Sequence, residues 1–169
     1  MKSTRKSSTG FTIIEALLAI VLVGALLVAS LQTASTSAAA QYKAGERAMG
    51  RYLAQGLMSD ILQKVYEDPN NVTLVLGVDT LNFELPISKS NYNDVDDYNG
   101  WTESPPQDQD GTVIPGFTDW SRSVLVEWVN ASNISQTSAT ESCAKRITVT
   151  VKHNNITIAT LVAIKCRVS

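Results

Sequence analysis

The chain has few of the residues from which enzyme active sites are built. Its 169 residues include a single histidine, His153, and two cysteines, Cys143 and Cys166, which do not form a C-x-x-C pair. It contains no glycine-rich phosphate loop, no G-x-S-x-G motif and no paired histidines at a metal-ligand spacing. We therefore expect that the protein is not an enzyme and that it needs no cofactor.

Basic residues are also too few to form a nucleic-acid-binding surface. The 14 lysines and arginines are outnumbered by 16 aspartates and glutamates. Three of the basic residues, Lys2, Arg5 and Lys6, stand in the first ten positions. No basic patch with interleaved aromatic residues occurs elsewhere, so we predict no nucleic-acid partner.

Proline is absent from the first 68 residues, which permits one long helix. Residues 11–31 are almost entirely apolar, and about 20 such residues suffice to cross a membrane. In residues 32–68 the apolar residues recur at three- and four-residue steps, which is typical of an amphipathic helix. The predicted buried stripe consists of Met49, Tyr52, Leu53, Leu57, Ile61, Leu62 and Val65. We expect a helix from Phe11 to about Tyr66, and Pro69 ends the pattern.

One acid, Glu15, interrupts the apolar run. A lone charge at membrane depth costs several kcal/mol, so an acid in such a place is expected to have a partner and a function. A cut after Gly10 would create that partner, because the new α-amino group of Phe11 would be a cation at the head of the same helix.

These residues resemble the start of a type IV prepilin or a type II secretion pseudopilin. The basic leader ends in Gly10, Phe11 follows, and Glu15 is the fifth residue of the chain that a cut would leave. The resemblance implies that a prepilin peptidase cleaves after Gly10 and methylates Phe11. It also implies that Glu15 neutralises the amino terminus of a neighbouring pilin subunit during assembly on an inner-membrane platform. Many pilins carry a proline in the apolar stretch, whereas this chain has none.

Two other interpretations of the N-terminus remain open at this point. In the first, residues 1–40 are a secretory signal peptide, and Ala38-Ala39-Ala40 is a cleavage site that releases a soluble periplasmic domain beginning at Gln41. The apolar run is longer than the 7–15 residues of a usual signal h-region, which argues against this. In the second, the segment is an uncleaved signal anchor.

The middle of the chain is polar and rich in turn residues. Val72–Val78 and Leu81–Leu85 are predicted as short strands. The acidic segment that follows resembles a loop of minor pilins of the mannose-sensitive haemagglutinin (MSHA) type. We expect it to be a solvated loop held by Tyr98 and Trp101. The alternative is a calcium site, because hard cations prefer clustered oxygens. Its ligands would be Asp94, Asp96 and Asp97, although their spacing does not match an EF-hand.

The last third of the chain predicts an antiparallel sheet. Val124, Val126 and Trp128 alternate as in a strand buried on one face. Two further strands, Arg146–Lys152 and Ile156–Lys165, flank Asn154-Asn155, a pair suited to a two-residue hairpin turn.

Pairing His153 with Ile156 sets the register of this hairpin. In that register Val151 faces Ile158, Val149 faces Thr160, and Cys143 faces Cys166. Directly opposed residues are close enough for a disulfide, so we predict a Cys143–Cys166 bridge.

Together these patterns predict an α+β fold in which a long N-terminal helix packs on a small antiparallel sheet. The expected divisions are a leader (1–10), a transmembrane half-helix (11–31), an amphipathic continuation (32–68) and a periplasmic head (69–169). The expected function is that of a minor pilin or pseudopilin, anchored by a single span in the inner membrane. The alternative is an adhesin displayed on the filament, with Trp101 and Asp96 contacting a ligand.

Overall fold

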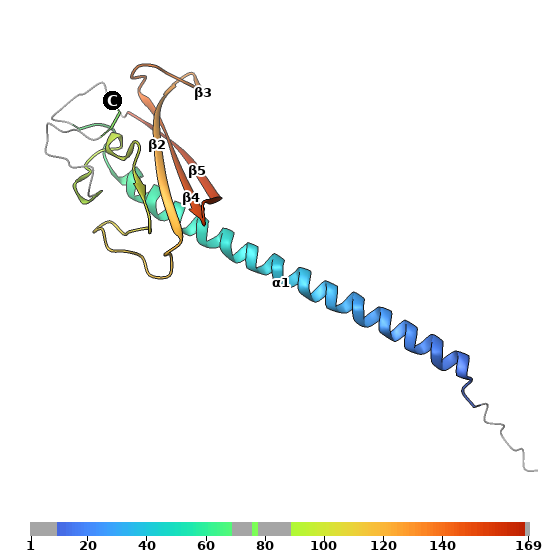
Figure 1. The fold of residues 1–169 in the computed structure, drawn as a ribbon. Coiled ribbons are helices and arrows are strands. Elements are labelled where there is room, and N and C mark those ends of the chain that lie inside the picture. The colour runs from blue at the N-terminus through green and yellow to red at the C-terminus, as the bar shows by residue number, and fades with distance from the viewer. Residues whose placement is uncertain (1–9, 69–75, 78–88, 168–169) are drawn as a thin grey trace, which may run out of the picture. The chain divides into compact units, whose positions relative to one another are not determined.

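The computed structural model describes residues 10–68, 76–77 and 89–167, and the chain divides into two compact units, residues 1–44 and 45–169. The longest element is helix α1, Ile13–Gln63, whose 51 residues begin in the first unit and end in the second (Figure 1). The helix predicted from the absence of proline is confirmed, and it ends three residues before the predicted Tyr66.

The described part of the first unit is the start of α1. From Ile13 to Leu31 the large apolar side chains of this segment are all exposed, with exposed fractions between 55% and 84%. The helix is long and apolar enough to cross a membrane. An isolated helix with such a surface is unstable in water, so its apolar side chains require lipid or other protein around them.

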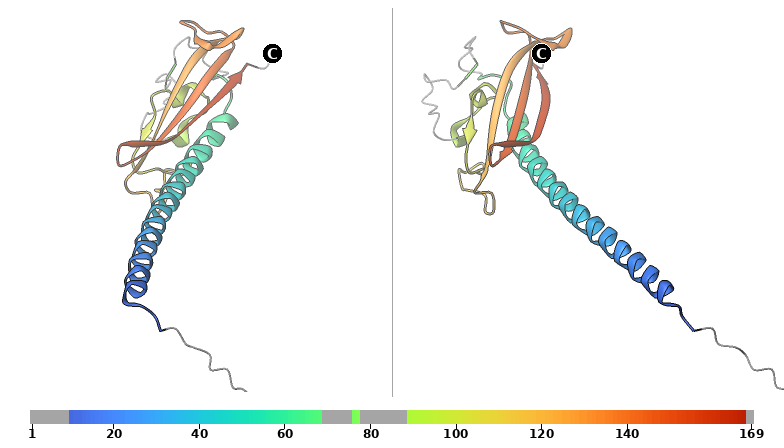
Figure 2. Two further views of the ribbon diagram at one scale, coloured as in Figure 1. Left: turned by 90° about the vertical axis from the view of Figure 1, so that its right-hand side faces the viewer. Right: turned by 45° about the vertical axis from the view of Figure 1, so that its right-hand side comes forward.

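The second unit is an antiparallel sheet packed against the end of α1. Its strands follow the order β1-β2-β4-β5, and β3 pairs with β2 beside this path. Figure 2 shows β2, β4 and β5 as long neighbouring strands. The strands are β1 (Thr102–Glu103), β2 (Trp120–Asn130), β3 (Asn133–Thr137), β4 (Ala144–His153) and β5 (Ile156–Cys166). This arrangement is the α+β fold expected from the sequence.

The core lies between one face of α1 and one face of the sheet. The helix contributes Leu53, Leu57 and Ile61, which are at most 1% exposed. Ile147, Val149 and Val151 of β4 are fully buried, with Val124 and Val126 of β2 beside them. Alternate residues of a strand point to the same face, which is why the odd-numbered positions of β4 form the core.

The predicted helix stripe is correct in its centre and wrong at its margins. Met49, Tyr52, Leu62 and Val65 are exposed, whereas Gly50, Ala54 and Met58 are buried instead. The seven predicted positions spread over a wider arc of the helix surface than one sheet face can cover, so those at the edges of the arc stay exposed.

The β4–β5 hairpin has the predicted turn but not the predicted register. Asn154 and Asn155 have φ values of 49° and 64°, as the turn requires, and His153 pairs with Ile156. A bulge then shifts the ladder, so that Val151 pairs with Ala159 and Val149 with Leu161. The extra residue, Ile158, packs against α1 at Gly50.

Two short 3-10 turns, η2 (Lys89–Asn91) and η3 (Asp96–Tyr98), precede the sheet. The strands predicted at Val72–Val78 and Leu81–Leu85 lie outside the described residues, apart from Leu76 and Gly77.

Candidate functional site

The first candidate site is the start of α1, where the sequence places Gly10, Phe11 and Glu15. Gly10 and Phe11 precede the helix, and the Phe11 side chain is 75% exposed. Glu15 lies in the first helical turn, where a carboxylate is stabilised by the helix dipole. It is the only acidic residue between Phe11 and Gly45.

Glu15 also takes part in a helix cap that the sequence analysis missed. Its backbone N–H donates to the Thr12 hydroxyl oxygen at 3.3 Å, and the Thr12 hydroxyl donates to the Glu15 carboxylate at 3.5 Å. The sequence signal is Thr-x-x-Glu, the capping-box pattern. Glu15 therefore has a local structural role in the helix cap, which is separate from the assembly role predicted for it.

The second candidate site, the acidic segment, is buried, and the expectation of a solvated loop is wrong. Asp94, Asp96 and Asp97 are 4%, 8% and 1% exposed. Asp94 Oδ1 accepts the backbone N–H groups of Asp96 and Asp97 at 2.6 and 3.2 Å. Asp97 Oδ2 accepts those of Asn93 and Asp94 at 2.9 and 3.2 Å. These carboxylates fold their own turn, since Asp side chains readily bond nearby backbone donors.

A lysine from the sheet neutralises part of this buried charge. Lys145 of β4 is fully buried, and its Nζ lies 2.8 and 2.7 Å from the two carboxylate oxygens of Asp96. It also donates to the Tyr66 carbonyl oxygen at 2.6 Å and lies 3.9 Å from the centre of the Tyr66 ring. The pair joins a loop to a strand 49 residues later in the chain.

The calcium alternative finds no support in this geometry. No group of three or more His, Cys, Asp or Glu side chains suited to a metal ion occurs among the described residues. Burial raises the pKa of Asp96 more than the Lys145 ammonium lowers it. Lys145 already supplies a cation to Asp96, and Asp94 Oδ1 and Asp97 Oδ2 accept hydrogen bonds from backbone N–H groups.

A second group of buried charges lies where the loop after β1 meets β2 and α1. Glu103 Oε1 accepts a hydrogen bond from Arg122 Nε, and Glu103 Oε2 accepts one from Lys89 Nζ at 3.3 Å. Arg122 Nη1 donates to the Leu53 carbonyl oxygen of α1 at 3.1 Å, and Nη2 donates to the Gln107 carbonyl oxygen. The three charged side chains are 3% or 4% exposed. Nothing in the local sequence identifies them, because the three positions are far apart in the chain.

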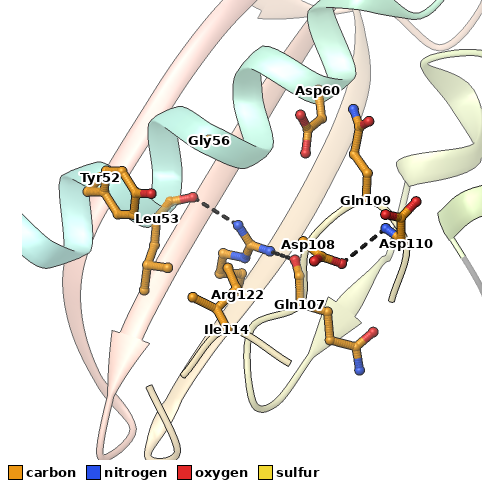
Figure 3. A pocket seen from close by; sticks show the side chains of 10 residues that line it. All are labelled: Tyr52, Leu53, Gly56, Asp60, Gln107, Asp108, Gln109, Asp110, Ile114 and Arg122. Atoms are coloured by element: carbon orange, nitrogen blue, oxygen red, sulfur yellow. Dashed lines mark hydrogen bonds between the residues drawn. The ribbon is translucent and has the colours of Figure 1, made fainter. Parts of the chain in front are cut away.

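An open cavity lies directly above Arg122 (Figure 3). Its volume is about 360 Å³, and it separates the outer side of α1 from the loop of residues 107–114. The helix side carries Tyr52, Gly56 and Asp60, and the loop side carries Asp108 and Asp110. Asp108 Oδ1 accepts the N–H groups of Asp110 and Thr112 at 3.1 and 2.8 Å, which fixes the loop.

The two cysteines do not form the predicted disulfide. Cys143 and Cys166 are both free and exposed. The bulge in β5 shifts the ladder by one residue, so Cys166 pairs with Ala144, and Cys143 takes a positive φ of 61° just outside β4. The predicted pairing depended on an unbroken register from the turn to the cysteines.

The residues proposed for ligand contact are structural as well. Trp101 packs edge-on against Tyr92, with ring centres 5.4 Å apart. Trp120 is buried and stacks on His153, whose Nδ1 lies 2.5 Å from Glu46 Oε1. His153 is thus held between β2 and α1. Asp96 is buried, so it is not free for the ligand contact that the adhesin interpretation assigns to it, whereas Trp101 is half-buried.

Comparison of the chain with protein-family models, curated proteins and solved structures finds no match.

Proposed function

We propose that this protein is a subunit of a type IV pilus or a type II secretion pseudopilus. A prepilin peptidase cleaves it after Gly10 and methylates Phe11, and α1 then anchors it by a single span in the inner membrane with the sheet in the periplasm. The supporting observation is a helix whose large apolar side chains from Ile13 to Leu31 are all exposed and whose first turn carries a single acid, Glu15.

The role of Glu15 in this proposal is electrostatic. An ammonium at Phe11 of one subunit and a carboxylate at Glu15 of its neighbour neutralise each other in an apolar setting, where an unpaired charge is costly. Among the described residues of one chain, the Glu15 side chain accepts a hydrogen bond from the Thr12 hydroxyl, and neutralising an amine is left to a second subunit. The other partners are the remaining pilin subunits and the assembly platform of the inner membrane.

The assignment to a minor subunit rests on the resemblance of the acidic segment to MSHA-type minor pilins. In the structure this segment packs on β4 and forms part of the core of the head. A subunit of this class acts through its place in the filament, which is consistent with a head whose charged clusters serve its own fold.

The cap at Thr12 offers a way to separate the two roles of Glu15. Glu15→Gln keeps a side-chain oxygen for the cap and removes the charge. Thr12→Ala removes the cap and keeps the charge, at a cost of about 1 kcal/mol of helix stability. We expect both variants to be cleaved, and we expect only Glu15→Gln to be lost from filaments, measured by immunoblotting of sheared filaments against whole cells. Equal loss of both variants would assign Glu15 to the cap and contradict the electrostatic role.

N-terminal sequencing of the protein purified from membranes tests the proposal as a whole. We expect a methylated phenylalanine, Phe11, as the first residue. Gln41 as the first residue would support release by signal peptidase, and an intact leader would support a plain anchor. Either result would end the pilin assignment.

A further inference from the structure

The cavity between α1 and the loop of residues 107–114 has acidic walls that no described basic side chain covers. We call the surface formed by Asp60, Asp108 and Asp110 the acidic cleft. Asp108 and Asp110 are exposed, and within the described part of the chain neither forms an ion pair. Figure 3 shows Asp60 directed from the helix toward the loop that carries the other two carboxylates. Arg122 at the floor is already held by Glu103 and by two carbonyl oxygens, so it leaves the cleft acidic.

A glycine, Gly56, lines the cleft on the helix side. A Cβ atom at Gly56 would have no heavy atom within 4 Å. Tyr52, one turn earlier, is 67% exposed and forms the other end of the cavity. An aromatic face next to carboxylates suits a guanidinium group, which can stack on the ring while it donates to the acids.

The same helix carries unpaired guanidinium groups on another side. Arg47 and Arg51 are exposed, stand four residues apart and form no ion pair within the described residues. Residues at this spacing are neighbours on one helix face, with Cβ atoms about 5–6 Å apart. We call these two residues the arginine ridge. Arg51 also borders a groove of about 260 Å³ against Ala159, Thr160 and Leu161 of β5, on the side of α1 away from Tyr52 and Gly56.

We propose that the arginine ridge of one copy of this chain docks into the acidic cleft of a second copy. Two exposed cations on a helix face match two exposed acids on a short loop in number and are opposite to them in sign. This inference rests on the proposed function, because anchored filament subunits lie side by side in the same orientation.

The two surfaces lie on different sides of one helix, so the contact is heterologous. Each copy that receives a ridge in its cleft still presents its own ridge to a third copy. Heterologous contacts that do not close into a ring produce open-ended assemblies. The contact therefore adds a charge-based interaction between heads to the proposed pairing of Glu15 with Phe11.

The test uses the processed full-length chain, purified from membranes in an uncharged detergent, with no other pilin present. Sedimentation equilibrium gives its self-association constant in 50 mM and 500 mM NaCl. Asp108→Asn with Asp110→Asn neutralises the cleft, and the amide oxygen introduced at position 108 can still accept the two loop N–H groups. Arg47→Glu with Arg51→Glu reverses the ridge. Matched controls are Asp119→Asn and Lys152→Glu, which alter exposed charges that line neither the cleft nor the groove beside Arg51.

We expect each double variant to weaken self-association by about tenfold in low salt, and the controls by less than about twofold. High salt should lower the self-association constant of the wild-type chain by a similar factor, because exposed ion pairs are screened. Arg51→Glu and Asp110→Lys should each weaken self-association. Combining the two changes in one chain should restore most of that loss, because the ion pair is re-formed with its charges exchanged. Wild-type association in both double variants, or no association of the wild-type chain, would overturn the proposal.

These outcomes are separable from a failure of the proposed function. If sequencing finds Phe11 first and Glu15→Gln is lost from filaments while the charge variants associate normally, only the docking contact is wrong. A plug in the cleft gives a second test, because Gly56→Leu leaves every charge in place. It should weaken association as strongly as neutralisation of the acids, and normal association of this variant would contradict the cleft as the docking place.

Discussion

Asp94 shows how a single buried carboxylate affects the stability of the head. Burial, together with the charges of Asp97 and Asp96, raises the pKa of Asp94 to about 6. The folded state therefore holds a proton on Asp94 more tightly than the unfolded state does. A group of this kind supports folding at low pH, and its contribution is lost as the pH rises through the folded pKa.

We predict that Asp94→Asn stabilises the protein at neutral pH. The Asn oxygen can still accept the N–H groups of Asp96 and Asp97, and no charge has to be buried. The free energy of unfolding at pH 7 should rise by about 1 kcal/mol, allowing for partial hydration of the site. Between pH 4 and pH 7 the variant should show a flatter loss of stability than the wild type, measured by chemical denaturation in detergent. An unchanged pH profile would contradict the prediction, and Asp119→Asn serves as the exposed control.

The chemistry of the acidic segment could not be predicted from the sequence at this scale. Three acids within four residues normally indicate a solvated loop. The cation that makes burial possible, Lys145, lies 49 residues away and is brought in by β4. Glu103 likewise pairs with cations that are distant in the sequence, Lys89 of η2 and Arg122 of β2. Glu15 stands out from the sequence as the one acid in an apolar run, because that signal is local, and its assembly role stays a prediction.

At the scale of elements, the contact between α1 and β5 depends on a glycine and a bulge. A Cβ atom at Gly50 would lie 2.7 Å from Ile158 Cγ2 and 3.2 Å from Ile158 Cβ. Ile158 is the residue that the bulge leaves without a partner on β4. The absence of a side chain at position 50 thus lets the helix and the bulged strand pack in direct contact.

We predict opposite effects for alanine at two helix glycines. Gly56→Ala should stabilise the head by about 0.5–1 kcal/mol, because alanine favours helix and the site is open. Gly50→Ala should destabilise it by about 1–3 kcal/mol through overpacking against Ile158. Thermal unfolding of the two variants measures both effects. In an Ile158→Ala background the penalty at position 50 should disappear, and a penalty that persists would contradict the proposed contact.

The elements themselves could largely be predicted from the sequence, whereas their register could not. The long helix follows from the missing prolines, and the hairpin turn from Asn154-Asn155. The bulge carries no local signal, because Ile158 is an ordinary strand residue whose displacement is set by the helix packed against it. That displacement was enough to invalidate the predicted pairing of Cys143 with Cys166.

At the scale of the whole molecule, the two units differ in how they are stabilised. Residues 45–169 hold the hydrophobic core, both groups of buried charges and every described strand. In residues 1–44 the described side chains are all exposed. The second unit therefore contains all the packing that a folded domain needs.

We predict that a fragment of residues 45–169 folds without the first unit. It retains the contact between Glu46 and His153 and the helix residues that cover the sheet. Its near-ultraviolet circular dichroism should match that of the full chain, and it should unfold in one cooperative transition without detergent. A fragment that stays unfolded or shows no cooperative transition would mean that the head depends on the preceding helix.

The open side of β5 has a consequence for how such heads coexist at high concentration. No described strand pairs with its outer edge, which runs from Ile156 to Ile164 without a charge or a proline, a composition typical of aggregation-prone edges. A flat edge of this kind would recruit strands from any crowded neighbour. The single displaced residue at Ile158 bends that edge and breaks its regular row of donors and acceptors. The bulge that shifts Cys166 out of register with Cys143 therefore also disfavours amyloid-like stacking on this edge.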